Sequence, residues 1–289
     1  MIIDFRHTPP TDEGLARYVN PPPHLQGYAE RYGERVYGGS NAEVTTMSAV
    51  ELLARLDQLG IDMAVLKSAD NESTHGTKYP LERLAAYVDG HGDRLFPVAG
   101  VDPHKGMVAV REVEWAVREL GFRGVNLGPF EQRLRANDAL YFPIYAKCVE
   151  FDIPVLLHTG VNFSSGLSLD FGHPRHLDDV AVAFPDLKIV AVHGGWPWVL
   201  ETVAVAWRHR NVFIDISGVR PRYILKPGSG WEPLLNYGAS VLADRVLWGS
   251  NWPQVAPEEW LAAIDSFPLS DDVRAKWLGG NAARLLGIT

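Results

Sequence analysis

The sequence contains eight short, nearly continuous apolar segments, each followed by a turn and a longer amphipathic stretch. These segments are residues 2–6, 61–67, 95–101, 122–127, 153–158, 187–193, 211–216 and 245–250. Apolar runs of this length are typical of strands that are covered on both faces, as in parallel sheets. Between them apolar residues recur at helical spacing, as in residues 48–60, which end at a glycine suited to a helix C-terminus. Eight such units predict one (β/α)8 barrel domain over residues 1–289.

Two stretches interrupt the alternation of strands and helices. Residues 9–46 form a long insertion after the first predicted strand and are rich in Pro, Gly and Tyr, and residues 217–231 follow the seventh strand. Both follow the carboxyl end of a strand, so both are expected at the mouth of the barrel, where such segments usually shape the active site. The alternative is that they are solvated loops without a role.

Charge and composition exclude several classes of partner. The net charge of −8 argues against nucleic acid, which requires a basic surface. No apolar run approaches the ~20 residues of a membrane span, and the N-terminus does not resemble a signal peptide. The single cysteine, Cys148, lies in a helical pattern and is expected to be a buried structural thiol. We therefore expect a cytoplasmic protein without disulfides.

Two histidines stand at the carboxyl ends of neighbouring predicted strands. His158 ends the fifth strand and His193 ends the sixth, and small residues follow each of them, at 159–160 and 194–195. In barrels of this kind the catalytic groups lie at these strand ends, and small neighbours would leave room for a ligand beside each ring. The alternative for a single histidine is a structural role, but the pair favours a site.

The first strand places a charge near the barrel interior. Strand alternation predicts that Arg6 and Thr8 share a face with Asp4, whereas His7 points the other way. A buried guanidinium without a partner is costly, so Arg6 needs an anion. Asp4 or Asp215 could serve as a structural partner, and a substrate carboxylate is the functional alternative, since its two oxygens match the guanidinium fork.

Five segments together resemble the amidohydrolase-related (amidohydrolase-2) family. They are MIIDFRH (1–7), IPVLLHTG (153–160), HPRHLDDVAVAFPDLKIVAVHGGWPW (173–198), RVLWGSNWP (245–253) and GGNAARLLGI (279–288). They span nearly the whole chain in the order that the family has. The resemblance implies a metal-dependent TIM barrel, in a branch that holds aromatic acid decarboxylases and lactone-hydrolysing enzymes.

The sequence departs from the family at the metal ligands. The family's paired strand-1 histidines fall on Arg6 and Thr8, and its strand-8 aspartate falls on Asn251. Of the usual metal set only His158 remains, and His193 matches a residue that in the family more often contacts substrate. A divalent cation needs several converging donors, so no cofactor is expected. The alternative is zinc held by His7, His158 and His193.

These observations predict a metal-independent hydrolase that acts on a small carboxylated substrate, such as a lactone, an ester, or a muconate-like or aromatic acid. In this hypothesis His158 or His193 is the general acid/base, Arg6 supplies the fixed positive charge, Asp215 orients a histidine, and Asn126 and Asn251 donate hydrogen bonds. The catalytic residues are expected to be His158, His193 and Asp215. The residues expected to contact substrate are Arg6, Thr8, Lys67, Asn126, Trp196 and Asn251.

Two other functions stay open at this point. A decarboxylase or other lyase of the same family would use the same Arg–His pair for proton transfer. A barrel without catalytic activity that binds a small acid is the alternative from another class, because the loss of three ligand positions is what drift from catalysis would leave. The abundant Trp and Tyr side chains are also candidates for a homodimer face.

Overall fold

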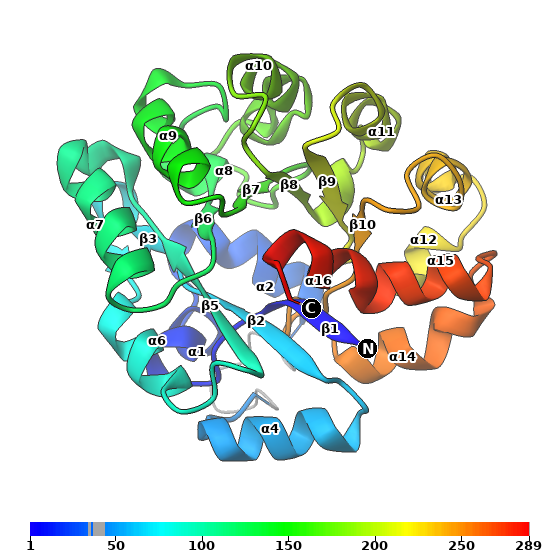
Figure 1. The fold of residues 1–289 in the computed structure, drawn as a ribbon, viewed down its shortest axis with the longest axis horizontal. Coiled ribbons are helices and arrows are strands. Elements are labelled where there is room, and N and C mark those ends of the chain that lie inside the picture. Colours follow the sequence, from blue (N-terminus) through cyan, green and yellow to red (C-terminus); the bar gives the residue numbers. More distant parts are fainter. Residues whose placement is uncertain (34–35, 37–43, 289) are drawn as a thin grey trace.

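Eight parallel strands form the centre of the protein in a computed structural model that describes residues 1–33, 36 and 44–288. The strand order is β1-β2-β5-β6-β7-β8-β9-β10. The strands are β1 (Ile3–His7), β2 (Met63–Lys67), β5 (Leu95–Gly100), β6 (Val125–Leu127), β7 (Val155–His158), β8 (Ile189–Val192), β9 (Val212–Asp215) and β10 (Val246–Leu247). Each lies within or overlaps one of the eight apolar segments, so the predicted (β/α)8 barrel is confirmed (Figure 1).

Backbone hydrogen bonds join the first strand to residues 248–252, which follow the last strand. Phe5 N donates to Trp248 O at 3.1 Å, and Thr8 N donates to Trp252 O at 3.0 Å. Asn251 N donates in the other direction, to Arg6 O at 2.7 Å. These bonds, together with a bridge between His7 and Trp252, connect β1 to the segment that follows β10, so the sheet nearly closes into a barrel and residues 6 and 251 come together.

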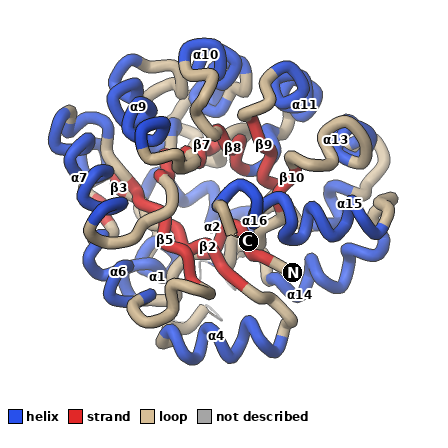
Figure 2. Tube along the Cα trace, in the orientation of Figure 1, coloured by secondary structure: helices blue, strands red, loops and turns tan. Residues whose placement is uncertain are grey.

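Helices surround the strands on the outside (Figure 2). The outer helices are α4 (Ala49–Gln58), α6 (Leu81–Val88), α7 (Met107–Arg118), α9 (Phe142–Glu150), α10 (Arg175–Ala183), α11 (Val199–Arg208), α13 (Glu232–Gly238), α14 (Pro257–Ala263) and α15 (Asp271–Ala275). The start of α4 shows how local sequence fixes these helices. Ser48 and Glu51 form a reciprocal capping box, and Gly60 follows with a φ of +68°. Most of the core lies between this ring and the outer strand faces.

The inside of the barrel is filled by a second, smaller apolar cluster. It includes Ile3 and Phe5 of β1, Val65 of β2 and Leu156 of β7. Helix α16 (Asn281–Leu286) packs Ala282, Ala283 and Leu285 against this cluster, beside β1 (Figure 1). The barrel is therefore a packed core closed at one end, and only its other end can hold a ligand.

Strand β1 does not follow the strict alternation that the sequence analysis assumed. Its pairing with β2 changes register between Asp4 and His7. As a result Phe5 lies in the interior cluster, and the next residue, Arg6, also faces the barrel mouth. Asp4 is fully buried and accepts hydrogen bonds from Ser250 N at 2.7 Å and Ser250 Oγ at 2.6 Å. The prediction that Asp4 and Arg6 share a face was wrong, because a register irregularity re-aims side chains.

Segments that follow the strands cover the open end. After β1 come α1 (Asp12–Val19) and α2 (Gln26–Tyr32), and after β9 comes α12 (Pro221–Ile224). A short β3–β4 hairpin (Asp70–Asn71, Thr77–Lys78), α5 (Glu72–His75) and α8 (Pro129–Gln132) lie nearby. Tyr32 Oη donates to Gly218 O at 3.2 Å, so the segments after β1 and β9 touch across the mouth. Residues 34–35 and 37–43 of the predicted insertion lie outside the described residues.

Two further expectations concern the role of Cys148 and the presence of membrane-spanning helices. Cys148 in α9 is fully buried, and burial raises the pKa of its thiol, in agreement with a structural role. In the described part of the chain, no helix combines the length and the apolar character that crossing a membrane requires.

Candidate functional site

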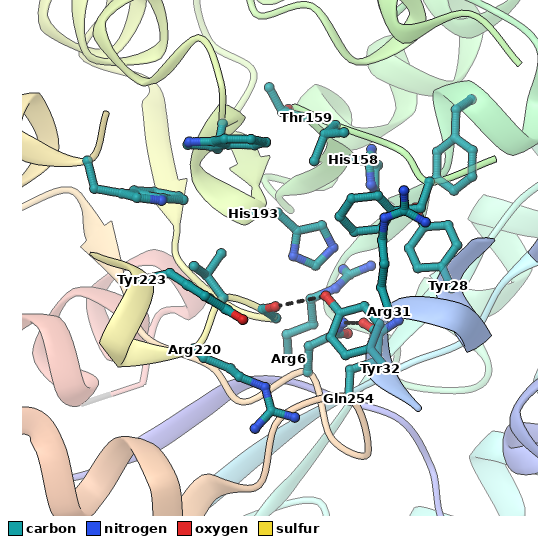
Figure 3. Close-up of a pocket in the computed structure, with 18 of the residues that line it drawn as sticks. Arg6, Tyr28, Arg31, Tyr32, His158, Thr159, His193, Arg220, Tyr223 and Gln254 are labelled. Carbon is teal, nitrogen blue, oxygen red and sulfur yellow. Dashed lines mark hydrogen bonds between the residues drawn. The ribbon is translucent and has the colours of Figure 1, made fainter. Parts of the chain in front are cut away.

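A cavity of about 690 Å³ opens at the mouth of the barrel, within the ~300–1,000 Å³ range of small-molecule sites. Its floor carries Arg6, Lys67, His158, His193 and Asn251, each from the end of a different strand. Figure 3 shows Arg6, His158 and His193 pointing toward one another beneath the covering segments. Of the nine site residues predicted from sequence, the structure therefore brings five to the floor and one, Trp196, to the wall.

Arg6 is a buried cation without an anionic partner among the described residues. Its side chain is 7% exposed, Nη1 donates to Asn126 Oδ1 at 3.0 Å, and Nε has no hydrogen-bond partner. Neither Asp4 nor Asp215 forms an ion pair with it within 4.0 Å, although the more distant charge of Asp215 favours its protonated form. Burial lowers the pKa of Arg6 to about 10, so the guanidinium is still charged at neutral pH. The site thus holds a fixed positive charge that lacks a counter-ion.

His193 presents one ring nitrogen to the cavity. Its Nδ1 lies 2.7 Å from Ser217 O. A carbonyl oxygen can only accept, so Nδ1 carries the proton and Nε2 keeps its lone pair. The ring of His158 lies 5.1 Å away, centroid to centroid, in an edge-on arrangement, and its buried Nδ1 has no hydrogen-bond partner. The pair therefore offers one oriented acceptor and one imidazole with a free polar atom.

Both imidazoles are held in the neutral form. Burial, followed by the positive charge of Arg6, lowers the pKa of His158 to about 3. The same two causes, in the same order, hold the pKa of His193 well below its usual 6.5. A neutral imidazole accepts a proton, so at neutral pH these side chains enter a reaction as bases rather than as acids.

Lys67 ends β2 on the same floor. Its Nζ donates to Thr8 Oγ1 at 3.2 Å, and Thr8 Oγ1 lies 3.3 Å from Tyr18 Oη. Thr8 does not line the cavity itself but lies behind Lys67, so the predicted contact between Thr8 and substrate is replaced by a contact with this amine. Burial and the charge of Arg6 hold the pKa of Lys67 well below its usual value.

Asp215 lies behind the histidine pair rather than in the cavity. It is fully buried, and its carboxylate accepts from Ser217 N at 3.0 Å and from Ser217 Oγ at 2.5 Å. Ser217 Oγ lies 3.4 Å from His193 Nδ1. Asp215 therefore reaches the imidazole through Ser217, and the predicted orienting role is indirect. Burial raises the pKa of Asp215 to about 6, against the opposing effect of Arg6.

The two asparagines differ from the donors that the sequence predicted. Asn126 Nδ2 donates to Ser68 O at 2.8 Å and its Oδ1 accepts from Arg6, so both of its groups are engaged and it positions Arg6. Asn251 Nδ2 donates to Gln254 Oε1, which leaves buried Oδ1 without a partner. Asn251 therefore offers an acceptor to the cavity.

His7 does not join the other histidines. Its ring stacks on Trp252 at 4.9 Å, and its Nδ1 lies 2.7 Å from Thr8 O. It is absent from the cavity lining that holds His158 and His193. His7 therefore does not meet His158 and His193 in the cavity lining, as the zinc alternative assumed, because its ring lies against Trp252.

The glycines after His193 serve the protein's own packing. Gly194 has a φ of +67°, and a Cβ there would lie 2.6 Å from the Trp231 ring. Gly195 has a φ of +79°, and a Cβ there would overlap the Thr202 hydroxyl. Trp196 then forms part of the cavity wall, with Nε1 donating to Ser229 O at 2.9 Å. These glycines therefore allow a close approach of two walls, in addition to any room that they leave for a ligand.

We expect Gly195→Ala to lower the free energy of unfolding by about 2–4 kcal/mol, since a left-handed backbone costs ~1–3 kcal/mol without glycine and overpacking adds a similar amount. Chemical denaturation would measure the change. Gly166→Ala is the matched control, because Gly166 is exposed and has no heavy atom within 4 Å of a Cβ. Equal effects of the two changes would contradict this explanation.

The two segments that the sequence predicted at the mouth form walls of the cavity, but the individual side chains that they contribute were not predicted. The segment after β1 contributes Arg17, Tyr18, Tyr28, Arg31 and Tyr32. The segment after β9 contributes Arg220, Arg222, Tyr223, Lys226 and Trp231. With Arg6 and Lys67, seven cationic side chains of the described residues line the cavity, and among those same residues Glu131 is the one acid in the lining. In a protein of net charge −8, this concentration of positive charge favours the approach of an anion to the cavity.

The negative charge of Glu131 is balanced by neighbouring cations. It accepts from Arg17 Nη2 at 2.9 Å and lies 3.3 Å from His24 Nε2. Burial alone would raise the pKa of this carboxyl, but Arg17 and His24 outweigh burial and hold the pKa well below its usual value. Glu131 therefore cancels the charge of Arg17 and leaves Arg6 and Lys67 without an acid of their own.

Solved structures share this fold over almost the whole chain. An uncharacterised TIM-barrel protein from Bordetella bronchiseptica is 27% identical, with a TM-score of 0.78 over 99% of this chain and 98% of that one. A dihydroxybenzoic acid decarboxylase from Polaromonas sp. JS666, with bound manganese and the inhibitor 2-nitroresorcinol, is 20% identical, with a TM-score of 0.70 over 99% and 97% of the two chains. At that identity the second likeness shows the fold alone.

The manganese in that neighbour raises the question of which groups here could hold a divalent ion. Across residues 1–33, 36 and 44–288, no three His, Cys, Asp or Glu side chains converge. Arg6 stands between the strand ends, and its charge lowers the pKa of both cavity histidines. A guanidinium repels a cation, and Thr8 and Asn251 are poor ligands beside it. This donor set does not fit a metal ion, and we derive no step through one.

Sequence comparison agrees with the structural likeness. Gamma-resorcylate decarboxylase from Polaromonas sp. is 25% identical over 244 residues, which cover 70% of this chain and 73% of that protein. Other curated relatives are aligned over a smaller part of their own length, and in one of them the aligned part is 13% of that protein. The sequence model of the Amidohydro_2 family, described as "Amidohydrolase", matches residues 24–288. The chain therefore belongs to the amidohydrolase family.

Proposed function

We propose that the protein is a metal-independent lyase that decarboxylates a small oxygen-substituted carboxylic acid. The observation that carries this proposal is the buried, uncompensated guanidinium of Arg6 beside the free Nε2 of His193. The guanidinium fork matches two neighbouring oxygens, such as those of a carboxylate or of a carboxylate and an adjacent hydroxyl. The curated gamma-resorcylate decarboxylase to which the chain is similar supports decarboxylation over hydrolysis.

The side chains on the floor suit each step of such a reaction. His193 Nε2 takes the proton of the substrate hydroxyl and delivers it to the carbon that bears the carboxylate. The bond between this carbon and the carboxylate then breaks, CO2 leaves, and the electron pair returns to the oxygen. Arg6 stabilises the negative charge that develops there, in a site where burial strengthens the interaction. A proton from water, passed through His193, completes the product.

Hydrolysis of an activated ester or lactone, which the sequence predicted, is the second candidate. A side chamber of about 40 Å³, lined by Arg6, Lys67, Asn126, Glu131 and His158, adjoins the main cavity. This space for the centre of a water exceeds the ~10–15 Å³ that one water molecule needs, and the chamber offers several polar partners. A neutral histidine at its edge would activate such a water as a general base.

Product analysis separates the two candidates. The protein would be incubated with hydroxylated benzoic acids and, separately, with aromatic lactones, while released CO2 and released acid are measured. Release of CO2 in step with loss of the acid supports the lyase. Release of acid from lactones alone would overturn the lyase in favour of the hydrolase.

We expect turnover to be insensitive to metal removal. Dialysis against a chelator should change kcat by less than twofold, and added manganese or zinc should not raise it, because Arg6 occupies the place of a cation. The metal content of the purified protein, measured by plasma mass spectrometry, should be far below one equivalent. One tightly held equivalent whose removal abolishes turnover would refute metal independence.

A further inference from the structure

We propose that Lys67 is a nucleophile that forms an imine with the carbonyl carbon of an oxo acid bound at Arg6. This inference rests on the proposed function for the anion site and extends its substrate class from hydroxy acids to acids that carry a ketone or aldehyde. Lys67 takes no covalent part in the reaction described above.

The position of Lys67 is the first support. It ends β2, lines both the main cavity and the side chamber, and shares both with Arg6 and His158. An acid whose carboxylate is held by Arg6 therefore presents its adjoining carbons to the same floor.

The bonding of Lys67 is the second support. In the described part of the chain its Nζ has one hydrogen bond, to Thr8 Oγ1 at 3.2 Å, and no carboxylate within ion-pair distance. Two nearby lysines are bound differently. Lys105 lies 2.6 Å and Lys78 lies 3.4 Å from the buried carboxylate of Asp70. Those two are structural cations, whereas Lys67 is left with an uncommitted amine.

Its surroundings favour the unprotonated, nucleophilic amine. Burial is the larger cause that lowers the pKa of Lys67, and the charge of Arg6 is the second. Desolvation and an adjacent cation are the two ways in which proteins activate lysine for imine formation. A bound carboxylate would offset the charge of Arg6, but the burial would remain.

The proposed reaction balances without any co-reactant. The Lys67 nitrogen attacks the carbonyl carbon and forms a carbinolamine, which takes up one proton from solvent and loses one water to give a protonated imine. From a 3-oxo acid, the bond to the carboxylate then breaks, CO2 leaves, and the electron pair moves to the imine nitrogen. The resulting enamine takes a proton at carbon, and addition of water releases the ketone and restores Lys67. His193 Nε2 lies on the same floor as an acceptor for the protons.

Reductive trapping tests this proposal. The protein would be incubated at pH 7 with sodium cyanoborohydride and phenylpyruvate, benzoylacetate or 2-oxoglutarate, and then mapped by peptide mass spectrometry. We expect one adduct per chain, at Lys67, formed at least tenfold faster than adducts at Lys188 or Lys276, which are partly exposed and paired with acids. Acetophenone, which has no carboxylate, should label Lys67 no faster than it labels those two. Labelling without preference for Lys67 with all three acids would overturn the inference.

A conservative variant separates this role from simple anion binding. Lys67→Arg supplies a fixed positive charge for anion binding but cannot form an imine, so it should abolish both labelling and oxo-acid decarboxylation while it retains thermal stability. If Lys67→Arg retains turnover and the wild type is not labelled, Lys67 only binds the anion, and the proposed lyase stands without the imine. If the wild type is labelled but releases no CO2 from any acid, the imine stands and the proposed lyase falls.

Discussion

Arg6→Met is expected to lower kcat/KM by about 10²–10³-fold, because removal of a buried charge that binds an anion costs ~2–5 kcal/mol. The same change should leave the free energy of unfolding unchanged or raise it. Arg6 is 7% exposed, lacks an ion pair and leaves Nε unsatisfied, so the folded protein bears the cost of its desolvation. Replacement of buried charges by apolar side chains often stabilises a protein by ~1–4 kcal/mol. Loss of activity with retained stability is the signature of a functional charge.

The two measurements are steady-state kinetics and chemical denaturation of the same preparations. Arg111→Met is the matched control, because Arg111 is exposed on α7 and should tolerate the change in both assays. Arg6→Lys keeps the positive charge but lacks the two parallel N–H donors of the guanidinium, so it should retain more activity than Arg6→Met. A large loss of stability in Arg6→Met with little loss of activity would show that Arg6 serves the fold.

His193→Ala is expected to lower kcat by about 10²–10⁴-fold, the usual contribution of a positioned general base. KM should change much less, because Arg6 still holds the anion. His91→Ala is the control, because His91 lies in the loop before β5, away from the cavity. A change in KM alone would mean that His193 binds substrate without moving a proton.

The pH profile tests the same assignment. His193 acts as a base in its neutral form, and burial and Arg6 hold its pKa well below 6.5. The neutral form therefore persists as the pH falls, and wild-type kcat should stay level from pH 7 to pH 5. In Arg6→Met one of the two causes is removed, so the pKa of His193 should rise toward 6.5. The pH below which the residual activity of this variant falls should rise with it. A wild-type acid limb near 6.5 would contradict the lowered pKa.

The alternation of apolar and amphipathic segments was sufficient to predict the barrel. Each strand is short, is covered on both faces and carries its own apolar run, so each strand can be recognised from its own residues alone. The strand ends then placed His158, His193, Arg6 and Lys67 correctly at the mouth. Their location could be predicted because the fold itself fixes where a strand end lies.

The same reasoning failed where position depends on contacts between distant segments. The register change in β1 moves Arg6 away from Asp4, and no residue in 1–7 signals it. The relay from Asp215 through Ser217 to His193 depends on how residues 215–217 meet residue 193 in space. The tyrosines and arginines of α1, α2 and α12 lie in segments without periodicity, so the sequence marked these segments as walls but did not select their residues.

The excess of cations in the cavity affects the choice of buffer for binding and activity measurements. Arg17 and Arg220 are paired with acids, but Arg6 and Lys67 have no ion pair within the described residues. A positive field of this kind does not distinguish phosphate from carboxylate, so we expect any abundant small anion to compete for the cavity. Buffers such as phosphate, citrate or sulfate would then compete with the acid under test and conceal its affinity. A zwitterionic buffer with little added salt would leave Arg6 open to the molecules offered to it.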